Sequence, residues 1–391
     1  MTPPSGKFIV QLFLVPGLIV GIIVGLLLFF TWAFGGPRSP GAFLRKLDDP
    51  NKEVRWRGAA DLAQVLKRDD RLASDGGFAS ELAARLERAT ESSAEAERSL
   101  AERWSKLKPE EAEAESRKLE PERNYSQYLM ACLGNFRVPA GVPMLRRLAE
   151  DDKGLEPGAL KERRRKAVWS LADLGQNLSR FENLPLPDQD VILASLDKLA
   201  DTDALHGQPA KEMSQFLRDR RAGHPRALGV DLTLEKCAGA EDSFLRELTA
   251  LALNFWPGTP AEEERMEKTL LQLAHDDGRS DVNGKSSEQF PKEQPRSVVT
   301  SPGLRVRLNA TVALARRGSQ RVRLDQLEEM LNVKRLGELC RVRAPDGTER
   351  SDDAFAAQTQ LAALRSILEL RKKQPSMDLA SLTGEIKRLA N

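Results

Sequence analysis

The sequence predicts an all-α protein, an irregular α-solenoid of helical hairpins preceded by a single transmembrane helix. Three observations predict this fold class. Residues 8–34 contain no charged side chain. The remainder is dominated by Ala, Leu, Glu, Arg and Lys, while aromatic residues make up only 5% of the chain, a composition that favours helices over β-sandwiches and barrels. Finally, one helical pattern of apolar residues recurs in several segments.

Residues 8–34 predict a membrane anchor that follows a short tail at residues 1–7. At a rise of about 1.5 Å per residue, this segment exceeds the roughly 30 Å hydrocarbon core of a bilayer. A secretory signal peptide is the main alternative, but its apolar region spans only about 7–15 residues and ends at small residues. This segment instead ends in an aromatic cluster that suits a membrane interface: Phe29, Phe30, Trp32 and Phe34.

Gly17, Gly21 and Gly25 form two overlapping G-x-x-x-G steps within the predicted membrane helix. Such a face lets a second helix approach closely, so the pattern predicts a homodimer through this helix. The alternative is that glycine is simply common in membrane helices.

Lysine and arginine set membrane orientation, and they favour a cytoplasmic position for the large domain. Only Lys7 precedes the segment, whereas several cations follow it closely: Arg38, Arg45, Lys46, Lys52, Arg55 and Arg57.

After a linker at residues 35–40, the helical domain is expected to fill residues 41–391. A short helix at Gly41–Leu47 is followed by an Asp-Asp-Pro turn and then by a helix at 52–66. One face of that second helix gathers apolar residues at helical spacing: Ala59, Leu62, Ala63 and Leu66. The same pattern returns at 161–175 and at 304–318, which we interpret as internal repeats.

These repeated segments resemble the second helix of HEAT repeats, an armadillo-like helical family. The resemblance rests on DDPNKEVRWRGAADLAQVL, KERRRKAVWSLADLG and LRVRLNATVALARRG. VPMLRRLAEDD at 142–152 is similar to the first helix of such a pair. The same pattern of apolar residues predicts further repeat units at 124–136, 242–256 and 354–370. The resemblance implies stacked helical hairpins, which cannot bury their apolar faces alone and share one continuous core.

Three segments interrupt or end the predicted stack. Residues 90–123 are densely charged with both signs, and we interpret this charged insertion as a solvated helical hairpin broken near Pro109, with a partner-binding arm as the alternative. Residues 277–303 lack a helical period and are rich in Gly, Ser and Pro, which predicts a flexible loop. The final segment, 376–391, is expected to form a helix that closes the end of the stack.

Sequence motifs for catalysis are missing, so we expect no enzyme activity, no cofactor and no metal. The chain has no G-x-S-x-G, Walker A or H-E-x-x-H motif. Its three histidines, His206, His224 and His275, are far apart and have loop-like neighbours. The three cysteines are odd in number and widely spaced, which excludes a disulfide framework by pattern and predicts core positions. They are Cys132, Cys237 and Cys340.

The strongest cationic cluster consists of Arg163, Arg164, Arg165 and Lys166. It is a candidate contact site for phosphate or anionic lipid, but the net charge is only +2 and no aromatic residues are interleaved, so we expect no nucleic-acid partner. The leading hypothesis is a membrane-anchored, non-catalytic scaffold that binds an unknown protein. Two alternatives stay open: a HEAT-like lyase, because some HEAT-like families resemble chromophore lyases, and an adaptor that acts through 161–166.

Overall fold

The described residues of the computed structural model form a predominantly helical body. They comprise 40–182, 184–202, 207–222, 227–256, 258–276, 297–298, 302–343 and 348–390, together with Val20 and Gly25. The predicted membrane segment 8–34 therefore lies outside the described residues, apart from those two positions, and so do the linker at 35–39 and most of the predicted loop at 277–303. No helix in the described ranges combines the length and apolarity needed to cross a bilayer.

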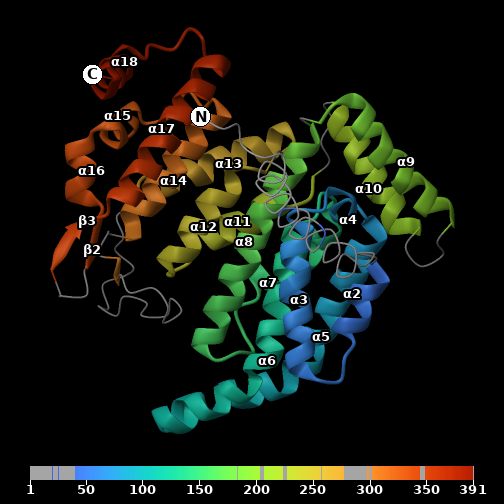
Figure 1. Cartoon of the computed structure of the whole chain (residues 1–391). Helices are drawn as coiled ribbons and strands as arrows, with labels where there is room; N and C mark the ends of the chain where they lie inside the picture. Colours follow the sequence, from blue (N-terminus) through green and yellow to red (C-terminus); the bar gives the residue numbers. More distant parts are fainter. Residues whose placement is uncertain are drawn as a thin grey trace, which may run out of the picture.

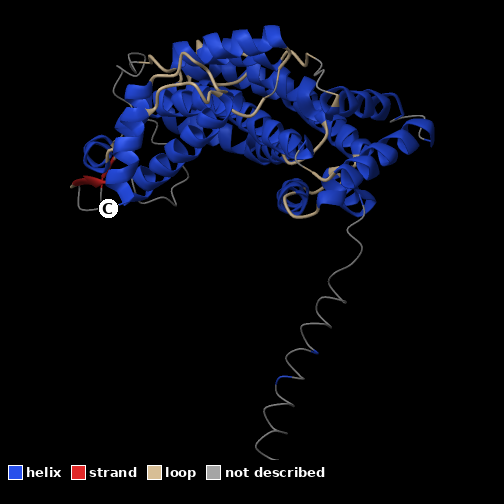
Figure 2. Cartoon of the chain, turned by 90° about the horizontal axis from the view of Figure 1, so that it is seen from above, coloured by secondary structure: helices blue, strands red, loops and turns tan. Residues whose placement is uncertain are grey.

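Six helices that are not consecutive in the chain lie side by side in one row, which we call the central row (Figure 1). Each packs against the next in this order: α3 (Lys52–Leu66), α6 (Pro109–Gly134), α8 (Pro157–Glu182), α12 (Ser243–Leu253), α14 (Pro302–Arg317) and α17 (Asp353–Lys373). Seen from above, the described body is arched (Figure 2).

A second row of helices covers one side of the central row. Each of its members packs against a central-row helix that follows it in the chain. In order these are α2 (Pro40–Leu47), α5 (Gly76–Arg103), α7 (Val142–Glu150), α11 (Val230–Ala238), α13 (Pro260–Leu273) and α15 (Leu324–Leu331). The body is thus a succession of helical hairpins, because each second-row helix and its partner run in sequence and share a buried face.

The remaining elements decorate these rows. The hairpin of α9 (Leu186–Thr202) and α10 (Gly207–Arg221) leaves the rows between α8 and α11, and α10 returns to pack on α5. The shorter helices are α4 (Asp70–Ala73), α16 (Val333–Leu339) and α18 (Ala380–Ala390), with 3₁₀ turns η1 (Trp104–Lys106) and η2 (Pro139–Gly141).

A small antiparallel sheet is the one departure from the expected all-α class in the described residues. Its strands are β1 (Ser297–Val298), β2 (Arg341–Arg343) and β3 (Glu349–Ser351), in the order β1-β2-β3. Val298 pairs with Val342, and Arg341 pairs with Ser351. The sequence between β2 and β3 reads APDGT, and Pro-Asp-Gly favours a tight turn between strands. Such short strands carry too little alternation to be predicted from periodicity.

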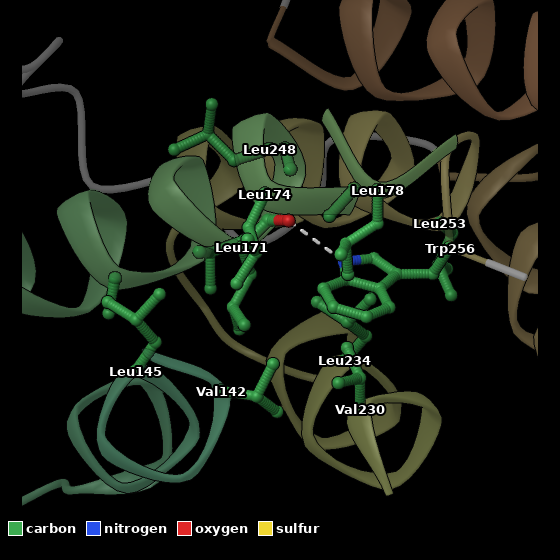
Figure 3. Close-up of a cluster of buried hydrophobic side chains, with 14 of the residues drawn as sticks. Val142, Leu145, Leu171, Leu174, Leu178, Val230, Leu234, Leu248, Leu253 and Trp256 are labelled. Carbon is green, nitrogen blue, oxygen red and sulfur yellow. Dashed lines mark hydrogen bonds between the residues drawn. The ribbon is translucent and has the colours of Figure 1, made fainter. Parts of the chain in front are cut away.

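The predicted apolar stripes are buried where the structure describes them. In α3 the stripe of Ala59, Leu62, Ala63 and Leu66 is buried. Leu171 of α8 and Leu308 of α14, from the other two repeated segments, are also buried. Figure 3 shows how four helices share one part of this core, with leucines of α8 and α12 facing valines of α7 and α11 around Trp256. Burying each such side chain contributes about 1.5–3 kcal/mol.

At each contact between consecutive helices of the central row, a side chain donates a hydrogen bond to a backbone carbonyl. The donor belongs to the later helix or the residues just after it. The carbonyl belongs to the earlier helix or to the residue just after that helix. This feature was not predicted. The five bonds run from Asn135 Nδ2 to Ala63 O (3.0 Å), Asn177 Nδ2 to Gly134 O (3.0 Å), Trp256 Nε1 to Leu171 O (2.9 Å), Arg317 Nη1 to Leu253 O (2.7 Å) and Gln374 Nε2 to Gly318 O (2.8 Å). We call them the step bonds. Carbonyls in the last turn of a helix lack intrahelical donors, so the bonds to Gly134 O and Leu253 O also satisfy groups that their helices leave unpaired.

Residues 90–123 form a helical hairpin that is broken next to Pro109, as predicted. They are the distal parts of α5 and α6, joined around η1 at residues 104–108, so the charged segment lengthens one hairpin of the row. The N-terminal part of α6 extends past its neighbours at the bottom of Figure 1. The final helix, α18, packs on α15 in the second row. It thus covers the end of the second row, whereas the expectation had it close the whole stack.

Candidate functional site

A cavity of about 380 Å³ opens where the long α5–α6 hairpin meets the start of α8. One wall is a face of α5 from Thr90 to Arg98, and the opposite wall is a face of α6 from Glu122 to Met130. The turn that follows α7, with Asp151 to Leu155, and the first turns of α8 complete the lining. Residues three and four apart on a helix share a face, which explains why each wall is formed by one stripe of its helix.

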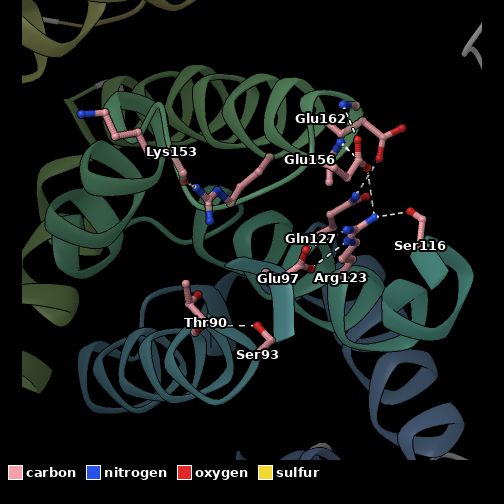
Figure 4. A network of polar contacts seen from close by, with 12 residues as sticks. Thr90, Ser93, Glu97, Ser116, Arg123, Gln127, Lys153, Glu156 and Glu162 are labelled. Atoms are coloured by element: carbon pink, nitrogen blue, oxygen red, sulfur yellow. Dashed lines mark hydrogen bonds and ion pairs between the residues drawn. The ribbon is translucent and has the colours of Figure 1, made fainter. Parts of the chain in front are cut away.

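The polar centre of this site is Arg123, which forms ion pairs with two buried glutamates, Glu97 and Glu156 (Figure 4). Its Nε and Nη2 donate to the two carboxylate oxygens of Glu97 at 2.8 and 2.7 Å, and its Nη1 donates to Glu156 at 3.2 Å and to Ser116 Oγ at 2.7 Å. Both glutamate side chains are only 6% exposed. Burial alone would lower the pKa of Arg123, but the hydrogen bond and charge of Glu97 outweigh it and raise the pKa.

Glu156 also fixes the start of α8. Its Oε2 accepts from the amide of Gly158 at 2.6 Å, and its Oε1 accepts from the amide of Ala159 at 2.9 Å. The first amides of a helix have no intrahelical acceptor, and a carboxylate satisfies them while complementing the helix dipole. The chain Glu97–Arg123–Glu156 therefore ties α5 and α6 to the N-terminus of α8.

The opposite end of the cavity is formed around the turn at Lys153 and Gly154. Arg163 of α8 donates to Asp151 Oδ2 at 2.7 Å and to the backbone carbonyl of Lys153 at 3.4 Å. Gly154 has a φ of 82°, which favours glycine, and a Cβ at this position would lie 3.6 Å from Arg98 Cγ. Burial lowers the pKa of Arg163, although the charge of Asp151 opposes this.

The lining suits a peptide better than a single ion. Its charged members balance, with four carboxylates (Glu97, Glu122, Asp151 and Glu162) and four cations (Arg98, Arg123, Lys153 and Arg163). Between them lie apolar side chains that include Met130, Leu148 and Leu155. A peptide segment presents both apolar side chains and polar backbone groups, which matches a mixed lining of this kind.

Two of the three hydroxyl side chains that line the cavity donate hydrogen bonds within their own helix. Thr90 Oγ1 donates to Leu86 O at 2.8 Å, and Ser93 Oγ donates to Ala89 O at 3.1 Å, both within α5. No cysteine or histidine lines the cavity. In the described ranges, no cluster of three or more His, Cys, Asp or Glu residues has the geometry to hold a metal ion.

The predicted basic cluster does not gather on one surface. Arg163 reaches Asp151, and Arg164 Nε donates to Ala149 O at 3.0 Å, so both hold the end of α7. Arg165 forms two hydrogen bonds of 2.6 Å to Asp242 at the start of α12. Lys166 is half-buried, and burial lowers its pKa. Consecutive helix residues point about 100° apart, so adjacency in sequence did not imply one surface.

The other residues singled out from the sequence are partly described. Gly17 and Gly21 lie outside the described residues, and a Cβ added at Gly25 would meet nothing within 4 Å. Cys132, Cys237 and Cys340 are all buried and free. Burial raises the pKa of the Cys132 thiol, and it raises the pKa of Cys237 and of Cys340 to about 11, so the three thiols stay protonated at neutral pH.

The histidines do not form a site in the described residues. His275 is exposed at the end of α13, with Nδ1 2.8 Å from Leu271 O. His206 and His224 lie outside the described residues.

Sequence reasoning missed the Arg123 network because it treated residues 90–123 as solvated surface. The sequence carries no simple signal for this pair. Residues 97 and 123 lie at unequal distances from the turn at 104–108, so the symmetry of a hairpin does not place Glu97 opposite Arg123. Comparison with known proteins adds no identification, since the chain matches no family model and no curated protein at a significant level.

Proposed function

We propose that this chain is a HEAT-like α-solenoid that works as a non-catalytic scaffold and binds a segment of a partner protein. The observation that carries the proposal is the central row with its step bonds, from Asn135–Ala63 at one end to Gln374–Gly318 at the other. Because each hairpin repeats the same contact with its neighbour, the body behaves as a stack of similar units. Stacks of this kind offer long surfaces for partners.

The cavity between α5, α6 and α8 is the proposed binding site for the partner segment. Its lining combines balanced charges with apolar side chains. The Arg123 network pre-orders one wall, so little ordering of the site would accompany binding, and preorganised sites lose less entropy on association. A volume of about 380 Å³ accommodates a few side chains of an extended peptide.

Specific contacts favour the scaffold over the two alternative functions. An adaptor that acts through residues 161–166 needs free cations, whereas Arg163 and Arg165 pair with Asp151 and Asp242. A lyase needs an activated acid, base or nucleophile, and the cavity hydroxyls of Thr90 and Ser93 donate to their own helix.

We further propose that residues 8–34 hold the scaffold at a membrane as a single-pass anchor, with the helical domain on the cytoplasmic side. The support is the uncharged length of the segment and the cations that follow it. Washing membranes with alkaline carbonate should leave the full chain in the pellet, and its release into the supernatant would reject the anchor. A dimer through this helix should weaken in Gly21→Leu.

The binding proposal is tested with a photocrosslinking amino acid in the full chain. Benzoylphenylalanine at Ser126, a half-buried residue that lines the cavity, should crosslink to one partner protein in cells. The matched control carries the same group at Ser195, an exposed position on α9. Filling the cavity with Ala94→Leu should abolish the crosslink from Ser126. If both positions capture the same proteins, or if Ala94→Leu changes nothing, the cavity is not the site.

A further inference from the structure

Among the described helices, the central row ends at α17, and no further helix of the row covers the outer side of α17. Every earlier helix of the row, from α3 to α14, has a following row helix packed against it. In the described part of the chain no further row helix follows α17, and α18 packs chiefly on α15 instead. The second row is therefore covered at this end, whereas the central row is not.

The open side of α17 carries an apolar stripe. Leu361 and Leu368 are 48% and 63% exposed, and Leu364 between them is only partly buried. Their spacing of three, four and seven residues places them on one face of the helix. This is the same spacing with which row helices bury leucines against a neighbour, so the face matches another helix in shape.

Two arginines, Arg365 and Arg316, border this stripe. Arg365 lies between the leucines and is exposed, and the half-buried Arg316 of the neighbouring α14 lies close to it. No ion pair is found for either guanidinium among the described residues. The carboxylate of Glu369, whose charge acts on Arg316, is itself paired with Lys372 at 2.7 Å. Burial and the like charge of Arg365 lower the pKa of Arg316, although the charge of Glu369 opposes this. Two arginines and Lys372 therefore share one carboxylate, and the net charge beside the stripe is positive.

We propose that the outer face of α17 binds an acidic amphipathic helix supplied by a partner protein. The leucines of the partner helix would pack on Leu361, Leu364 and Leu368 in the position of the next row helix. Its carboxylates would pair with Arg365 and Arg316, which gives the complex its charge specificity. This surface is separate from the cavity at α5 and α6. Its test therefore does not depend on whether a partner segment binds in that cavity.

The test uses two synthetic peptides of about 16 residues, a length at which an isolated helix persists. Both carry leucines at the spacing of Leu361, Leu364 and Leu368. One has glutamates on the flanking positions, and the other has lysines there. Binding to the full chain in detergent is measured by fluorescence anisotropy. The acidic peptide should bind at least about tenfold more tightly than the basic one, because only the acidic peptide neutralises the two arginines.

Three variants make the test specific to this face. Leu368→Ser should weaken binding of the acidic peptide about tenfold, and Arg365→Glu should reverse the preference in favour of the basic peptide. Leu186→Ser removes a leucine of similar exposure, 58%, at the start of α9 and should leave binding unchanged. All three positions are exposed, and circular dichroism checks that the variants fold.

Two results would overturn the proposal. The first is equal binding of both peptides, or a preference that Arg365→Glu leaves unchanged. The second is a dimer of the full chain that becomes monomeric in Leu368→Ser during sedimentation, because the face would then be occupied by a second copy of this chain.

Discussion

Two junctions hold neighbouring helices together by opposite means. Between α8 and α12, the 2% exposed Trp256 fills the space beside Gly175, where a Cβ would lie only 2.9 Å from Trp256 Nε1. Between the α5–α6 hairpin and α8, the contact is the buried ionic network of Arg123. Around Trp256 the first junction depends on volume and shape, while the Arg165–Asp242 pair lies at the other end of α12. The second depends on every charge keeping its partner, because an isolated buried charge is costly.

The apolar junction should be the more sensitive to a single truncation. Trp256→Ala removes the largest side chain of that core and the step bond to Leu171 O, so we expect the free energy of unfolding to fall by about 3–5 kcal/mol. Urea unfolding of the full chain, followed by circular dichroism, measures this. Trp169→Ala is the matched control, because Trp169 is 43% exposed and its loss should cost less than about 1 kcal/mol. Equal losses would contradict the assignment of Trp256 as the core of this junction.

The ionic junction should lose stability when one charged member of its network is removed. Arg123→Ala leaves the carboxylates of Glu97 and Glu156 buried without their cation, and we expect a loss of about 3 kcal/mol in the free energy of unfolding. Adding Glu97→Gln should recover part of this loss, since a neutral amide is cheaper to bury. The same urea experiment measures both variants.

Arg117→Ala controls for the general effect of losing an arginine from α6. Its partner Glu113 and Arg117 itself are 63% and 68% exposed, and such pairs contribute only about 0.3–0.5 kcal/mol. If Arg117→Ala and Arg123→Ala cost the same, the network at the cavity contributes nothing beyond an ordinary surface pair.

The comparison also explains what the sequence could predict. Helices with a clear apolar stripe were located closely: the segment predicted at 52–66 is α3 (Lys52–Leu66). The period of the stripe alone determines such a helix. The partners of charged residues were not predictable in this way, because Arg165 meets Asp242 and Arg123 meets Glu156 across long stretches of sequence. Those pairings depend on which helices become neighbours.

The candidate site also combines features that the sequence could predict with features that it could not. Its apolar walls, such as the stripe that includes Met130, arise from helical periodicity and could be anticipated. Its polar centre could not, because Glu97 is buried only after α5 and α6 pair and α8 starts beside them. The step bonds were missed for a related reason. Asn135, Trp256 and Gln374 are different residue types that fill equivalent positions, so no repeated letter marks them in the sequence.

A third junction, between α7 and α11, is more exposed to solvent than the other two. We expect its loss to have the smallest effect on the free energy of unfolding. Glu150 at the end of α7 accepts hydrogen bonds from Thr233 and Lys236 of α11, and its side chain is 25% exposed. Burial alone would raise the pKa of Glu150, but the hydrogen bonds and the charges of Lys236 and Arg146 outweigh it and lower the pKa below 4.5.

A carboxyl whose pKa is lowered by folding stabilises the folded state above its unfolded pKa, and this stabilisation disappears as the pH falls through the folded pKa. Glu150→Gln should therefore lower the free energy of unfolding by less than about 1 kcal/mol at pH 7, and by progressively less as the pH falls below 4.5. Urea unfolding at a series of pH values measures this difference. Glu235→Gln removes the same charge from an exposed position on α11 and serves as the control. A loss that is equal for both variants at every pH would mean that the contacts of Glu150 with α11 add nothing to the stability of the fold.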